Sequence, residues 1–81
     1  MNNFGLFQTI AEHIETVSGI NTKISDLMKA AGNDEEKALT FIVNHYVQVC
    51  GTYNTTPRNI KGAEKMIADR VELLNNVAEY A

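Results

Sequence analysis

The side chains best suited to catalysis in this sequence are two histidines and a single cysteine. His45 and Cys50 are five residues apart in a segment with helical periodicity, which places the imidazole and the thiol on different faces of a helix. His13 lies in another segment, at the border of an apolar helix face, where an imidazole is usually half-buried and structural. The chain contains no HExxH metal motif, phosphate-binding glycine loop or nucleophile elbow. We therefore expect no catalytic residues and no enzymatic activity.

Metal and redox chemistry are limited by the same composition. One cysteine can form neither an intramolecular disulfide nor a cysteine-based zinc cluster. The first residues lack the basic region of a signal peptide, and no apolar run approaches the ~20 residues of a membrane span. We expect a cytoplasmic protein that holds no metal and no cofactor and does not bind a membrane.

A basic cluster near the start of the last predicted helix could bind an anion. Its residues are Thr55, Thr56, Arg58, Lys61 and Lys65. Hydroxyl groups and cations at a helix N-terminus suit phosphate, a nucleotide or an acidic segment. The alternative is that Lys61 pairs with Glu64, and that Lys65 pairs with Asp69, along the same helix.

A second candidate surface lies in the twenty residues 38–57, which contain no charged side chain. Within a helix of this segment, a neutral polar strip and its flanking rings could contact a protein partner, because interface cores are depleted in charge and enriched in aromatics. The candidate partner-binding residues are Thr40, Phe41, Asn44, His45 and Gln48. The alternative is that this is simply the central helix of the fold, packed on most sides. Tyr53, in the loop that follows, could cover the core or present its ring to a partner.

The last helix carries two apolar stripes side by side. One stripe can pack on the protein's own core, and the other on a second copy of the chain. The candidate self-association residues are Met66, Arg70, Leu73, Val77 and Tyr80. Arg70 would either lie along the edge of this apolar face, with its aliphatic stem buried and its guanidinium in water, or pair with a carboxylate of another chain.

These residues are positioned by four predicted helices, over residues 4–18, 22–31, 34–50 and 57–80. Apolar side chains recur at helical spacing, and glycines separate the first three segments. Asn33 and Glu36 have the spacing of a capping box, and Thr56 before Pro57 predicts the start of the last helix. Strand-like alternation is absent. The fold class is therefore all-α: a compact three- to four-helix bundle with a long C-terminal helix, in one domain over residues 1–81.

DNA binding through a helix-turn-helix is disfavoured. The N-terminal residues of the recognition helix would be Asp34, Glu35 and Glu36, which would face a polyanion. The formal net charge of −3 also argues against a general nucleic-acid binder.

Together these features favour a small non-enzymatic protein–protein interaction module. It would act as a regulator, inhibitor or adaptor of the kind that bacteria, plasmids and phages encode as accessory proteins, binding another protein stoichiometrically and forming a homodimer or higher oligomer. The alternative is a binder of a phosphorylated small ligand, nucleotide or nucleic acid through the basic cluster.

Overall fold

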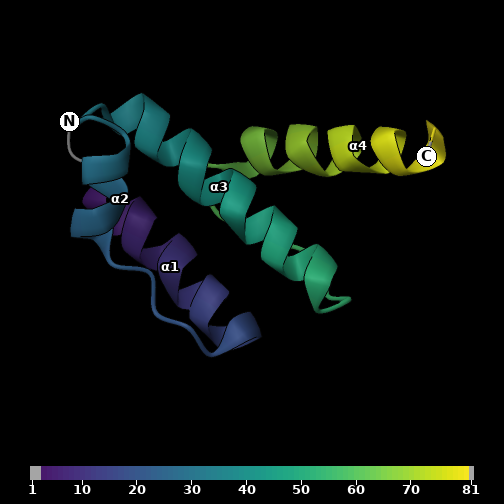
Figure 1. The fold of residues 1–81 in the computed structure, drawn as a ribbon, viewed down its shortest axis with the longest axis horizontal. Coiled ribbons are helices and arrows are strands. Elements are labelled where there is room, and N and C mark those ends of the chain that lie inside the picture. Colours follow the sequence, from purple (N-terminus) through teal and green to yellow (C-terminus); the bar gives the residue numbers. More distant parts are fainter. Residues whose placement is uncertain (1–2, 81) are drawn as a thin grey trace.

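The computed structural model describes residues 3–80, with side chains described for residues 3–76 (Figure 1). The chain there is all-α, which confirms the predicted helical bundle. Its helices are α1 (Phe4–Ser18), α2 (Ile24–Ala30), α3 (Glu35–Thr52) and α4 (Glu64–Tyr80). None of the helices in this described part is long and apolar enough to cross a membrane.

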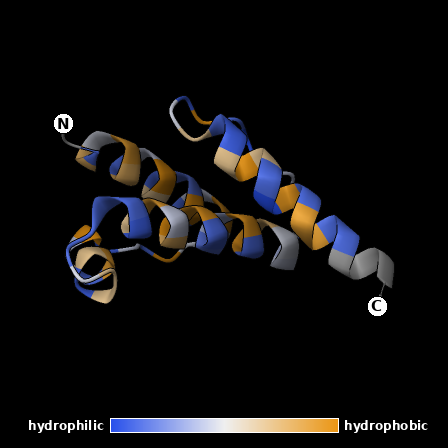
Figure 2. Cartoon of the chain, turned by 90° about the horizontal axis from the view of Figure 1, so that it is seen from above, coloured by the Kyte–Doolittle hydropathy of each residue, from blue (hydrophilic) through white to orange (hydrophobic). Residues whose placement is uncertain are grey.

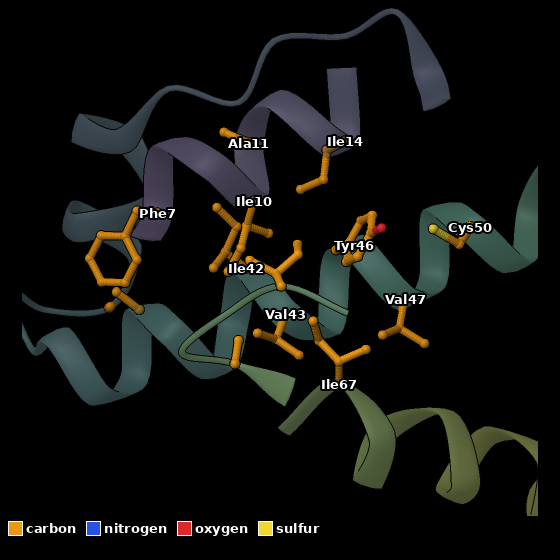
Figure 3. Packing of buried hydrophobic residues seen from close by; sticks show 14 residues of the cluster. Phe7, Ile10, Ala11, Ile14, Ile42, Val43, Tyr46, Val47, Cys50 and Ile67 are labelled. Carbon is orange, nitrogen blue, oxygen red and sulfur yellow. The ribbon is translucent and has the colours of Figure 1, made fainter. Parts of the chain in front are cut away.

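The helix α3 is the centre of the bundle and packs against each of the other three helices. Its buried face carries Ile42, Val43, Tyr46 and Cys50, each at most 1% exposed, which explains much of the missing charge in this segment. Phe7 and two isoleucines of α1 cover one side of this face, and α4 covers the other with Ile67 (Figure 3). Burying a large apolar side chain contributes about 1.5–3 kcal/mol, so this central layer is the main source of stability.

The ends of α1 and α3 follow local capping chemistry. Gly19 adopts a left-handed conformation (φ 76°), and its N–H donates to the carbonyl oxygen of Glu15 at 2.7 Å, which ends α1. Asp34 is the N-cap of α3: its Oδ1 accepts from the backbone N–H of Glu36 at 3.0 Å and of Lys37 at 3.3 Å.

The boundaries predicted for α2 and α3 differ from the structure by one or two residues. The cap of α3 is Asp34 rather than Asn33, because Asn33 adopts a left-handed conformation (φ 63°) and its N–H donates to Met28 across the turn. The helix α2 is shorter than the predicted 22–31, and α3 runs two residues beyond the predicted end at Cys50.

The prediction that the last helix begins at Pro57 is wrong. Residues 55–60 carry no regular structure, and α4 begins at Glu64. Gly62 has φ 99°, which no right-handed helix contains, and the N–H of Ala63 donates to Ile60 in a tight turn. The helix therefore has 17 residues, or about 26 Å at 1.5 Å per residue. The segment before it is held by tertiary contacts: Ile60 and Ala63 are buried in the core.

Candidate functional site

The most distinctive surface of the described chain lies where residues of the connection between α1 and α2 line the same hollows as residues of α3. Three large apolar side chains are exposed here: Ile20 at 67%, Tyr53 at 53% and Phe41 at 43%. We call this the Ile20 surface; it consists of Ile20, Phe41, His45, Gln48, Val49, Thr52 and Tyr53.

Two shallow hollows lie on the Ile20 surface. One, of about 350 Å³, lies between Ile20 and Tyr53, with Val49 among the residues that line it. The other, of about 410 Å³, lies between the α1–α2 connection and Phe41. Ile20 and His45 line both hollows, so the two are neighbours along α3.

The local sequence explains how these side chains come together. Phe41, His45, Gln48 and Thr52 have the i, i+4, i+7, i+11 spacing that aligns residues on one helix face. Ile20 directly follows the left-handed end of α1, so the chain leaves the helix before this side chain can reach the core. Its backbone N–H donates to Ser18 Oγ at 3.1 Å, which holds the turn.

The chemistry of the Ile20 surface is apolar contact with neutral hydrogen bonding. No carboxylate, lysine or arginine lines the smaller hollow, and Lys23 and Asp26 are the charged residues that line the larger one. An imidazole, an amide and a hydroxyl from His45, Gln48 and Thr52 supply donors and acceptors. Exposed aromatic and apolar groups surrounded by neutral polar groups are typical of the centre of a protein interface.

Three of the five predicted partner-binding residues belong to this surface: Phe41, His45 and Gln48. Thr40 is exposed but lines neither hollow, and its hydroxyl donates back to the Glu36 carbonyl oxygen at 3.1 Å. Asn44 is half-buried and lines neither hollow. Both lie farther round α3, because each residue turns the helix by 100°.

Ile20 was missed by the sequence analysis, although it is the most exposed large apolar residue described. The available signal was an isoleucine immediately after the helix-ending Gly19, outside any apolar stripe. Tyr53 was left open between core and partner; its ring is 53% exposed and lines the smaller hollow.

The predicted basic cluster is divided by the structure. Thr56 lines a hollow on one side of α4 with Ile67 and Val71, whereas Lys61 and Lys65 line a different hollow with Met66. Arg58 and Lys61 precede the first residue of α4, so only Lys65 of these three cations lies on the helix.

The two lysines lie among carboxylates. Lys65 Nζ is 3.1 Å from Asp69 Oδ2, and Glu64 lines the same hollow as Lys61. Hydrogen bonds from the backbone N–H groups of Glu64 itself and of Gly62 lower the pKa of the Glu64 carboxyl, so it is charged at neutral pH. Anion binding here stays a prediction, and it would require an anion to compete with these carboxylates.

The cysteine and the two histidines lie in different environments. Cys50 is fully buried, and burial raises the pKa of its thiol; His45 is exposed on another face of α3. The His13 ring lies 5.9 Å from the Tyr46 ring, at a tilt of 53°. In the described part of the chain, no group of three or more histidine, cysteine or carboxylate side chains could hold a metal ion.

The predicted self-association face is partly described. Met66 and Arg70 are half-buried on α4 and Leu73 is 50% exposed, whereas the side chains of Val77 and Tyr80 lie outside the described residues.

Comparisons with protein-family models, with curated proteins and with solved structures found no match to this chain.

Proposed function

We propose that this chain is a small non-enzymatic interaction module, a regulator, inhibitor or adaptor, that binds one protein partner stoichiometrically through the Ile20 surface. The observation that supports the proposal is the exposure of Ile20, Phe41 and Tyr53 around two adjoining hollows with few charges. When a partner covers water-exposed apolar surface, the free energy of the system falls by about 25 cal/mol per Å² of surface buried.

The partner chemistry that suits this surface is the apolar face of an amphipathic helix. The two hollows adjoin along α3 and each has room for a large apolar side chain. A helix presents such side chains at i and i+4 or i+7, and helices commonly dock in grooves in this way. Lys23 and Asp26, at the edge of the larger hollow, would meet the polar margin of the partner helix.

The proposal includes two further features of the whole protein. One is self-association into a homodimer or higher oligomer. The other is a cytoplasmic location, supported by a single buried, unpaired cysteine, as is usual for proteins of reducing compartments.

Paired lysine substitutions on α3 test the binding proposal. The tagged protein and its variants would be used for affinity capture from host lysate with nuclease, followed by mass spectrometry. We expect the wild type to recover one protein in stoichiometric amount and Phe41→Lys not to recover it. The reason is that the substitution places a charge beside the larger hollow of the Ile20 surface. Thr40→Lys is the matched control: it adds the same charge one residue away, at an exposed position outside both hollows, and it should retain that protein.

Circular dichroism would confirm that both variants are folded. Recovery of no stoichiometric protein, or equal recovery by wild type and Phe41→Lys, would contradict the proposal.

The alternative function is binding of a phosphorylated ligand or nucleic acid through the divided basic cluster. It is favoured by a hollow of about 690 Å³ lined by Lys61 and Lys65. Binding that depends on cations weakens steeply as salt rises, whereas binding at the Ile20 surface should change little between low and moderate salt. Replacing both lysines with glutamate would abolish only the cation-dependent binding.

A further inference from the structure

His45 lies where the two hollows of the Ile20 surface adjoin. It shares with Ile20 the property of lining both hollows. The residue is exposed, and within the described part of the chain its imidazole takes part in no hydrogen bond or ion pair. Both ring nitrogens are therefore available to a proton or to a partner, and a substitution here breaks no contact that the fold needs.

The charged and titratable groups that face His45 are few. The smaller hollow adds one titratable side chain, the phenol of Tyr53, and no charged one. The larger hollow adds Lys23 and Asp26, from the α1–α2 connection and from α2, and their opposite charges balance. From α1 the residue that lines the smaller hollow is Ser18. The helix α4 has its C-terminal half directed away from the bundle (Figures 1 and 2), and none of its described side chains lines either hollow.

The charge of the two hollows therefore depends on the protonation of one residue. While the His45 ring is neutral, the residues that line the hollows carry no net charge, and protonation adds one positive charge. Histidine is the side chain whose charge ordinarily changes between about pH 5 and pH 8, whereas carboxylates and lysine ammonium groups ordinarily titrate outside that range.

Covering the hollows changes the environment of this added charge. On the free protein, water solvates an exposed imidazolium. A partner that fills the hollows with apolar side chains removes that water, and burying a charge without a partner of opposite charge is costly. The complex should therefore prefer the neutral imidazole.

We propose that His45 makes partner binding at the Ile20 surface dependent on pH, so that the complex is strong at about pH 8 and weakens toward about pH 5.5. The inference rests on the proposed function, because it requires a partner that covers both hollows. Its sign follows from the reciprocity of linked binding: if the partner disfavours the proton on His45, the proton disfavours the partner by the same factor.

Isothermal titration calorimetry at the two pH values tests the proposal. The titrant is the protein that the wild type captures from lysate in stoichiometric amount at about pH 8, identified by mass spectrometry and purified. Roughly one tenth of an ordinary histidine population is neutral at about pH 5.5, so we expect the wild type to bind about tenfold more weakly there. Equal affinity at both values, or tighter binding in acid, as a partner carboxylate against His45 would produce, would overturn the proposal.

Two variants assign the effect to His45. His45→Gln keeps a donor and an acceptor but does not titrate, so its affinity should be nearly the same at both pH values. His13→Gln is the matched control: the imidazole that it removes lies 5.9 Å from the Tyr46 ring and lines neither hollow, so the variant should keep the tenfold change. A His45→Gln variant that is folded by circular dichroism and keeps the wild-type dependence would refute the role of His45.

Failure of the proposed function gives a different result from failure of this inference. If the wild type captures no stoichiometric protein at about pH 8, the premise is wrong and the inference falls with it. If it captures one that Phe41→Lys does not, and the affinity is independent of pH, the Ile20 surface remains the binding site and only the role of His45 is rejected.

Discussion

At the scale of single residues, Tyr46 connects two parts of the chain, α3 and the segment that contains Arg58. Its ring is 1% exposed in the core, yet its hydroxyl oxygen accepts from the backbone N–H of Arg58 at 2.9 Å. The same hydroxyl interacts with the thiol of Cys50 one helical turn away. One side chain thus holds the irregular segment before α4 against α3, which helical periodicity could not indicate.

The burial of Tyr46 and Cys50 predicts a loss of stability at alkaline pH. Burial raises the pKa of Cys50 above its ordinary value of 9.0, and burial raises that of Tyr46 above 10.0 against the opposing Arg58 hydrogen bond. Because both folded-state pKa values are raised, the folded protein binds more protons than the unfolded chain at alkaline pH. The stabilisation is complete below the unfolded pKa values and is lost as pH rises through the folded ones.

Urea unfolding at a series of pH values checks this prediction. We expect the free energy of unfolding to fall from about pH 9 upward, and Cys50→Ala to remove the earlier part of the decrease while lowering stability at neutral pH. Stability that is unchanged between about pH 8 and about pH 11 would contradict the burial of these two side chains.

At the scale of elements, Gly62 determines where α4 begins. The sequence places Gly62 inside a continuous pattern of apolar spacing after Pro57. If it were helical there, replacing it with alanine would raise the free energy of unfolding by about 1 kcal/mol. In the structure its φ of 99° is unfavourable for any residue with a Cβ, and a Cβ would lie 3.4 Å from Leu6 Cδ2.

The substitution Gly62→Ala therefore distinguishes the two arrangements by the sign of its effect. We expect the free energy of unfolding to decrease by about 1 kcal/mol or more. Gly51→Ala is the matched control: Gly51 lies within α3, nothing is within 4 Å of an added Cβ, and stability should increase by about 0.5–1 kcal/mol. A stabilising Gly62→Ala, measured by urea or thermal unfolding, would show that the helix starts earlier.

At the scale of the whole molecule, the two proposed surfaces lie on different elements. The Ile20 surface combines the α1–α2 connection with an exposed face of α3, whereas the predicted self-association residues lie on α4, which does not pack on α1 or α2 in the described chain. Substitutions at sites that are well separated and share no partners usually have additive effects.

Partner binding and dimerisation should consequently be separable. We expect Phe41→Lys to lose the partner but remain a dimer, and Leu73→Glu to become a monomer that still binds the partner. Sedimentation of each variant, alone and with the captured partner, measures both properties. If either substitution abolished both while circular dichroism showed a folded bundle, the two surfaces would have to be one.

Local sequence was sufficient for the fold class and for the first helix, whereas it left the central place of α3 as one of two alternatives. These depend on apolar spacing within about 18 residues and on caps such as Gly19, whose energetics involve only neighbouring residues.

The start of α4 and the composition of the Ile20 surface were decided by the tertiary structure. A buried Tyr46 hydroxyl bound to Arg58 and a left-handed Gly62 beside Leu6 outweigh the local helix-start signal of Thr56 and Pro57. Ile20 and Tyr53, 33 positions apart in the printed sequence, meet at one hollow only because α1 packs on α3. Periodicity reports on neighbours within a helix, whereas contacts between distant segments depend on how the helices pack.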